Sequence, residues 1–354
     1  VSVLAGCSID MAFTQLYKLY GFQTFDLKKT LFLRHTAFYR WPMRKKITLL
    51  QHHICLLLLL CGGVTYAQQE PQYTQYMYNT LTVNPGYTGT PGVLQANLLH
   101  RTQWVGMRGA PQTQAFSIHT PWSELYEQIG VGLSVVNDQL GPSNEVYADG
   151  NFSYALKMGE ESKLVFGLKA GVRVLNIDWS KGRYRQEGDP LLNTNINNRF
   201  NPTIGAGIYY YTSNWYAGVS VPNFIQNNYY NDVQESMMAD RLHYYVIGGY
   251  VFNLSEDIKF KPAVLAKIVN GAPITADVSA NFLLQEVVTL GAAYRWDDSV
   301  SALAGVQVSR NIFVGYSYDY SVTELNKYNN GSHEFMLRFE LAPKTKRIMS
   351  PRFF

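Results

Sequence analysis

Six charged residues are the best candidates for chemistry in this chain, because they lie on the polar side of segments that alternate apolar and polar residues. They are Asp149, Lys157, Lys169, Arg173, Asp277 and Asp319. Both charge signs are present, and each of the six has uncharged, mostly apolar residues on either side of it in the chain. We expect these side chains to line a polar lumen.

Residue patterns that carry catalysis are missing. The four histidines after residue 67 form neither an H-x-x-x-H nor an H-E-x-x-H arrangement, and there is no G-x-S-x-G elbow and no Walker loop. The neighbouring carboxylates of Asp297 and Asp298 are of the type that binds calcium, but such a pair more often forms a solvated turn. The sequence therefore predicts a protein that is not an enzyme and that uses no metal and no small-molecule cofactor.

The segments that position the six charges have a period of two. It is clearest from Val146 to Lys157 and recurs in Leu164 to Val174, Ile274 to Leu284 and Ile312 to Tyr320. Successive side chains of a strand point to opposite faces, and about ten tilted residues cross a bilayer. One face of each strand would therefore meet lipid, and the charged face would meet the lumen. Gly130 and Gly132 also fall in a strand pattern, where a glycine pair marks packing or curvature rather than phosphate binding.

About 14 such strands are expected, with boundaries good to a few residues. They lie near 93–104, 112–120, 128–138, 144–157, 162–177, 200–212, 214–222, 241–253, 257–269, 273–284, 286–296, 299–309, 311–321 and 332–341. The connections alternate in length, apart from 121–127. Long ones such as 178–199 and 222–240 alternate with tight ones such as 159–161 and 212–214.

This pattern predicts an all-β fold, a transmembrane antiparallel β-barrel of outer-membrane type. Such barrels have an even number of strands, short periplasmic turns and long outside loops, so both termini are expected on the periplasmic side. A soluble β-sandwich also alternates, but it more often uses strands of about 5–6 residues. Tyrosine and phenylalanine, at 26 and 18 residues, suit the aromatic girdles of a membrane barrel.

The N-terminal part reads as an export signal. Residues 43–67 have a basic start, an apolar stretch and a small-residue cleavage site, as in a Sec signal peptide, and residues 1–42 are expected to be an upstream extension from a mis-assigned start. Without residues 1–67 the chain has 22 basic and 24 acidic residues and no cysteine, so nucleic-acid binding and disulfides are not expected. The remainder divides into an N-terminal periplasmic or plug segment (68–92), the barrel (93–341) and a periplasmic tail (342–354).

Motifs along the chain resemble one family. Glu70 to Asn79 followed by Val83 to Gly89 is similar to the opening signature of the PorP/SprF membrane proteins of Bacteroidota, and further matches run to the last strand. The signature positions are Gln72, Gln75, Tyr76, Asn79, Asn84, Pro85, Gly89, Trp104, Gly109, Pro111, Thr113 and Asn137. The resemblance implies that these positions either hold the fold or meet a partner.

The resemblance implies a bacterial outer-membrane protein of the type IX secretion system and of gliding motility. It would help to export or anchor large secreted adhesins, with outer-membrane lipid and other secretion components as further partners and no nucleic acid. The alternative is a passive or ligand-specific outer-membrane pore. The charged residues of both signs on the inward-facing side of the strands favour this alternative.

Overall fold

We used a computed structural model, which describes residues 70–123, 127–182, 195–226, 241–269, 272–341 and Pro351. All of these belong to one of the two compact units of the chain, residues 63–354. The signal peptide and upstream extension predicted over residues 1–67 lie outside the described residues, as does most of the predicted C-terminal tail.

Strands make up most of the described chain. They are β1 (Gln95–Thr102), β2 (Gln112–Pro121), β3 (Ile129–Leu140), β4 (Ser143–Lys157), β5 (Lys163–Ile177), β6 (Ile196–Tyr211), β7 (Trp215–Val221), β8 (His243–Tyr250), β9 (Phe252–Asn253), β10 (Ile258–Val269), β11 (Thr275–Leu284), β12 (Val288–Arg295), β13 (Ser299–Ser309), β14 (Ile312–Ser321) and β15 (Ser332–Glu340). The helical turns are α3 (Thr80–Val83), η1 (Pro85–Tyr87), η2 (Trp179–Lys181) and η4 (Glu324–Lys327). No helix in the described ranges has the length and apolar character needed to cross a membrane.

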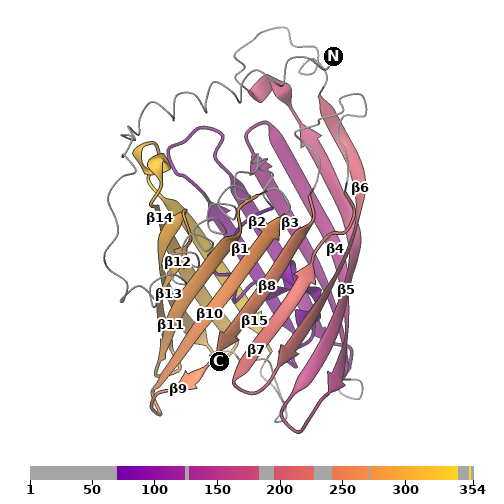
Figure 1. The fold of residues 1–354 in the computed structure, drawn as a ribbon, viewed down its shortest axis with the longest axis vertical. Helices are drawn as coiled ribbons and strands as arrows, with labels where there is room; N and C mark the ends of the chain where they lie inside the picture. Colours follow the sequence, from indigo (N-terminus) through magenta and orange to yellow (C-terminus); the bar gives the residue numbers. More distant parts are fainter. Residues whose placement is uncertain are drawn as a thin grey trace, which may run out of the picture. The chain divides into compact units, whose positions relative to one another are not determined.

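The strands form one closed antiparallel barrel. Each pairs with its neighbours in chain order, and the sheet closes where β15 pairs with β1 (Figure 1). Strands β8 and β9 both pair with β10 and are two parts of one wall strand, interrupted at Val251. The wall therefore has 14 strands, which confirms the predicted fold class.

The distribution of apolar residues is the reverse of that in a soluble protein. Leu168, Phe200 and Leu133 are 61%, 69% and 60% exposed on the outside of the wall, whereas Ser317 and Glu334 are fully buried inside it. Soluble proteins bury most leucines and leave most glutamates exposed. An apolar outer band around a polar interior is what a membrane barrel requires, because its outside faces lipid.

Residues 70–94, here called the lumenal segment, run through the inside of the barrel. The segment joins β1 at the end where short turns connect β4 to β5 and β6 to β7, and Leu341 there donates its N–H to the Leu94 carbonyl. At its other end Glu70 accepts a hydrogen bond of 2.9 Å from the Tyr245 hydroxyl, near the start of β8. β8 begins at the opposite end of the wall, the long-loop end, where long connections join β5 to β6 and β7 to β8.

The strand count predicts that the wall begins and ends on the short-turn side, and Leu94 and Leu341 meet there. Glu70, the first described residue, lies at the long-loop end because the lumenal segment passes through the lumen. An even number of strands thus determines where the wall begins and ends, but not where the preceding segment lies.

Candidate functional site: the filled lumen

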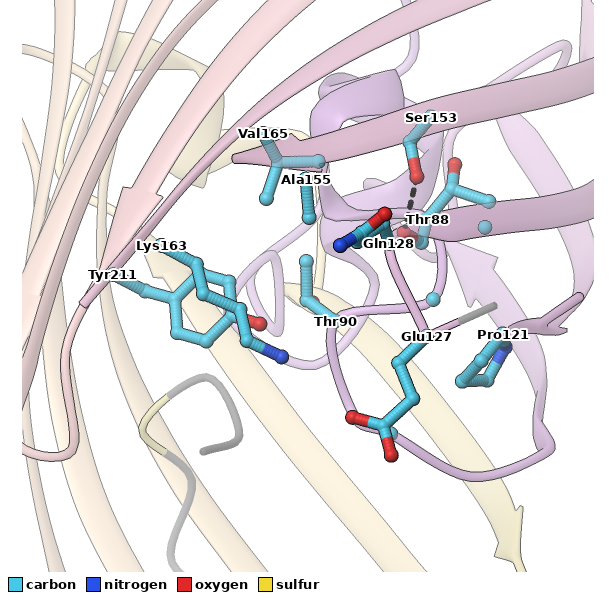
Figure 2. Close-up of a pocket in the computed structure, with 13 residues that line it drawn as sticks. Thr88, Thr90, Pro121, Glu127, Gln128, Ser153, Ala155, Lys163, Val165 and Tyr211 are labelled. Carbon is cyan, nitrogen blue, oxygen red and sulfur yellow. Dashed lines mark hydrogen bonds between the residues drawn. The ribbon is translucent and has the colours of Figure 1, made fainter. Parts of the chain in front are cut away.

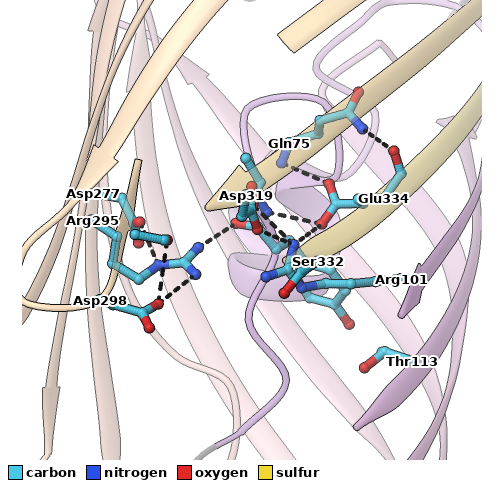
Figure 3. Close-up of polar contacts among 12 residues, drawn as sticks. Gln75, Arg101, Thr113, Asp277, Arg295, Asp298, Asp319, Ser332 and Glu334 are labelled. Atoms are coloured by element: carbon cyan, nitrogen blue, oxygen red, sulfur yellow. Dashed lines mark hydrogen bonds and ion pairs between the residues drawn. The ribbon is translucent and has the colours of Figure 1, made fainter. Parts of the chain in front are cut away.

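A buried charge cluster fixes the start of the lumenal segment. Arg101 on β1 lies 2.7 Å from Asp319 on β14 and 3.1 Å from Glu334 on β15, and these three side chains are at most 3% exposed (Figure 3). The two carboxylates also bind the segment. Glu334 accepts the backbone N–H groups of Thr74 and Gln75 at 2.9 and 2.8 Å, and the Thr74 hydroxyl donates to Asp319.

A second charge cluster lies on the neighbouring wall. Arg295 at the end of β12 contacts Asp277 at 2.6 Å and Asp298 at 3.1 Å, and it also donates to the Tyr73 carbonyl at 3.4 Å (Figure 3). Charged groups out of water are costly unless they are paired and hydrogen-bonded. Here the backbone of the lumenal segment supplies part of that compensation, so the wall and the segment depend on each other.

The middle of the segment rests on a patch of wall without side chains. Asn84, Pro85 and Gly86 form a tight turn in which Asn84 accepts the Gly86 N–H at 2.8 Å. The Asn84 amide donates to the Ile208 carbonyl at 3.1 Å. Three glycines on β5, β6 and β7 allow this approach, since an added Cβ would lie 2.2 Å from Pro85 at Gly167, 2.1 Å from Asn84 at Gly207 and 2.7 Å from Asn84 at Gly218.

We predict that Gly207→Ala displaces this turn. The new methyl group would overlap the Asn84 side chain, and overpacking of this kind costs about 1–3 kcal/mol of unfolding free energy. Gly150→Ala on β4 is the matched control, because its Cβ points outward and meets nothing nearer than the Ala170 carbonyl at 3.6 Å. Urea unfolding of both variants in detergent micelles measures the difference; equal midpoints would contradict the packing described here.

The last part of the segment is held at the short-turn end. Ser153 donates to the Thr88 carbonyl at 2.7 Å, and the Gly89 N–H donates to His119 at 3.0 Å. An added Cβ at Gly130 would lie 2.4 Å from the Thr88 carbonyl oxygen, so this glycine serves packing, as its place in a strand pattern indicates. A cavity of only about 20 Å³ remains beside these residues (Figure 2).

Aromatic and cationic side chains fill the space between these anchor points. The Tyr78 ring lies 5.8 Å from the Lys261 ammonium and 5.4 Å from the Arg338 guanidinium, within the range of cation–π attraction. The Tyr76 hydroxyl lies 3.4 Å from that of Ser279. Tyr73 to Tyr78 are all at most 6% exposed. The run of polar and aromatic residues near the start of the signature thus packs as an interior core.

A second small cavity lies between the segment and the wall of β3 to β8. Its volume is about 50 Å³, and Tyr147, Asp149, Lys169 and Tyr245 are among its lining residues. Spaces of this size hold a few water molecules at most. Fourteen strands enclose more volume than their own side chains fill. The buried residues of the lumenal segment occupy much of that volume.

The structure places the six charged candidates as follows. Asp149, Lys169, Arg173, Asp277 and Asp319 are buried on the inner side of the wall, and Lys157 is exposed. Lys157 shares the inward register of Asp149, but it is the last residue of β4 and lies beyond the packed interior, so it does not line the enclosed lumen. Lys169 pairs with Asp149 at 3.0 Å, and Arg173 lies 3.7 Å from Glu145.

Three important residues are absent from that set. Arg101, Arg295 and Glu334 anchor the lumenal segment but were not among the six candidates. They carry charge at inward register positions, as the six do, and extending the register to the ends of β1, β12 and β15 would have identified them.

The signature positions fall into two groups. Seven lie on the lumenal segment: Gln72, Gln75, Tyr76, Asn79, Asn84, Pro85 and Gly89. The other five lie at the long-loop end of β1 to β3: Trp104, Gly109, Pro111, Thr113 and Asn137. Asp297 and Asp298 form the turn after β12, where Asp298 pairs with Arg295. Among the described residues, no group of three or more His, Cys, Asp and Glu side chains has a geometry that holds a metal ion.

The position of Glu70 gives a test of topology. An epitope tag inserted between Gln69 and Glu70 is expected to be labelled by antibody on intact cells, because the long loops of outer-membrane barrels face outside. The same tag placed after Leu341, at the short-turn end, should be labelled only after permeabilisation. Labelling of the Leu341 tag alone on intact cells would contradict this course of the chain.

The closed wall, the apolar outer band and the filled polar interior define an outer-membrane β-barrel whose lumen is occupied by its own chain. Residues 65–339 match the family model of the type IX secretion system membrane protein PorP/SprF. The chain belongs to this family, which confirms the resemblance seen in its motifs.

Solved structures with a similar fold are distant in sequence. Omp33 of Acinetobacter baumannii has a TM-score of 0.40 and 9% identity, covering 71% of this chain and 100% of that one. The toluene transporter TbuX of Ralstonia pickettii has a TM-score of 0.45 and 8% identity, covering 73% of this chain and 92% of that one. No curated protein matches the chain.

Proposed function

We propose that this barrel is a closed outer-membrane component of the type IX secretion and gliding machinery that helps to export or anchor large surface adhesins. It catalyses no reaction. The observation that carries the proposal is family membership over residues 65–339 together with a lumen filled by the chain's own segment. A filled lumen suits a protein that holds or receives a partner better than one that passes solutes.

Charge pairing inside the barrel supports the same view. Several inner charges meet each other or the lumenal segment, as Arg101 does with Glu334 and Lys169 does with Asp149. A selective pore presents charged side chains to a water-filled constriction, where they meet the passing ion. The partner contacts are therefore assigned to the exposed rims of the barrel rather than to a passage through it.

The test is deletion of the gene followed by measurement of adhesin on intact cells with antibody. We expect surface adhesin to fall to background and to return when the intact protein is supplied. Complementation with Gly150→Ala, whose methyl group points away from the interior, serves as the matched control and should restore display fully. Undiminished surface adhesin in the deletion strain would overturn the proposal.

A further inference from the structure

The outer face of β1, β2 and β3 has a polar patch set into an apolar wall. The patch has two rows across the strands. The lower row, nearer the middle of the strands, is His100, Gln114 and Asn137. The upper row, nearer the long-loop end, is Thr102, Gln112 and Gln139. These side chains point outward, because the residues that alternate with them, such as Arg101 and Thr113, are buried in the lumen. The interior contacts of the filled lumen therefore do not explain them.

Apolar residues border the lower row on three sides. The row beneath it is Leu98, Phe116 and Val135, which are 52%, 42% and 40% exposed. Sideways, His100 lies opposite Phe335 on β15, and Asn137 lies opposite Val146 on β4. The patch is thus an inset in the lipid-facing band and not simply the level at which the whole wall becomes polar.

Hydrogen bonds join the members of the patch. The Asn137 amide donates to Gln114 at 2.6 Å, and Gln114 and Thr102 lie 3.4 and 3.2 Å from the two ring nitrogens of His100. The lower row is therefore held in a fixed arrangement, while the side chains of Gln112 and Gln139 above it are exposed. Polar groups that are fixed and exposed at the edge of an apolar wall are suited to bind a polar ligand.

A hollow of about 270 Å³ opens directly above the patch, in the loop that joins β1 to β2. Thr102, Gln112 and Gln139 belong to its lining together with Gln103, Trp104 and Met107. Its volume is slightly below the range of about 300–1,000 Å³ found for small-molecule pockets. None of the described residues that line it is Lys, Arg, Asp or Glu.

The loop around the hollow is held firmly, and it keeps Trp104 in an unusual conformation. Trp104 has a φ of 44°, a region that bulky residues rarely occupy. The backbone N–H of Trp104 donates to the Ser332 hydroxyl at 3.1 Å, and the backbone N–H of Val105 donates to the Gly331 carbonyl at 2.8 Å. Strain that the surroundings enforce is concentrated at functional sites. The loop thus holds Trp104 in the lining of the hollow together with three glutamines.

We propose that the patch and the hollow bind the saccharide headgroup of a glycolipid in the outer leaflet. Amide and hydroxyl groups match the many donors and acceptors of a sugar, and the amphipathic indole suits the boundary between lipid and water. Their outward position beside the apolar band gives access to a molecule in the membrane. The lack of charge in the lining favours hydroxyl groups over a phosphate as the recognised group.

The experiment measures binding of rough-type lipopolysaccharide to the purified protein in nanodiscs by native mass spectrometry, with phosphatidylglycerol as a sugar-free competitor. We expect saturable binding to the intact protein and about tenfold weaker binding to the variant Gln112→Leu/Gln114→Leu/Asn137→Leu, which loses the hydrogen-bonding groups. The apolar replacements continue the surrounding lipid-facing surface, so the barrel should fold.

Two further variants make the result decisive. Trp104→Gly removes the indole, and glycine adopts a positive φ without strain, so weaker glycolipid binding without loss of stability is expected. Tyr320→Leu removes an exposed hydroxyl from β14, at the long-loop end of the barrel but away from the patch. It should leave binding unchanged. Either equal binding of lipopolysaccharide by all variants or equal competition by phosphatidylglycerol would overturn the proposal.

Discussion

Deletion of residues 70–88 is expected to turn the closed barrel into an open pore. The deletion removes the anchors at Thr74, Asn84 and Thr88 and leaves the strand pairing of the wall intact. Barrels of 16–18 strands leave an aqueous channel, and a 14-strand wall without its filling approaches that case, so we expect sugar influx into proteoliposomes to rise by an order of magnitude or more. Liposome swelling measures this rise.

A milder variant provides a second test in case the deletion variant does not fold. Gly167→Val with Gly207→Val places side chains where Pro85 and Asn84 now lie, and valine is favoured in strands. This variant should give influx between those of the intact and the truncated proteins, and Gly150→Val, which faces outward, should give none. Background influx from the folded deletion variant would show that the segment does not close the lumen.

Replacement of Arg101 by methionine is expected to cause the largest loss of stability from a single residue. It would leave the carboxylates of Asp319 and Glu334 buried without their cation. Breaking a buried ion pair on one side costs about 3–5 kcal/mol, because the remaining charge is uncompensated. Urea unfolding in detergent micelles measures the loss.

Two comparisons show whether charge is the cause. Arg108→Met, at an exposed position of the β1–β2 loop, should change the unfolding free energy by at most about 0.5 kcal/mol. Arg101→Met combined with Asp319→Asn and Glu334→Gln removes the stranded charges and should recover much of the loss. If the triple variant is no more stable than Arg101→Met alone, lost packing rather than uncompensated charge would explain the effect.

The wall was predictable from the sequence because alternate residues of each strand in a membrane barrel face lipid and lumen. From Val146 to Lys157 the period of two gives both the strand and its orientation, and the structure has β4 over Ser143–Lys157. The same rule placed Asp149 and Asp319 on the inner face. Lys157 shows its limit, since alternation gives the face of a strand but not the point along it where the interior ends.

The course of the lumenal segment could not be derived in the same way. Residues 73–78 are polar and aromatic without alternation. Their contacts depend on distant parts of the chain, since Thr74 and Glu334 are 260 positions apart. The receiving surface at Gly167, Gly207 and Gly218 comes from three strands and shows in the sequence only as isolated glycines. Its meaning appears once the strand register brings these glycines together.

We propose that the intact protein is a closed barrel of the secretion machinery and not a passive pore. Planar-bilayer recording of the purified, full-length protein tests it most directly. The lumenal contacts of Arg101, Arg295 and Asn84 predict that the bilayer stays at baseline current, with no steady open level. A steady, ohmic conductance that appears with each inserted barrel would contradict the account.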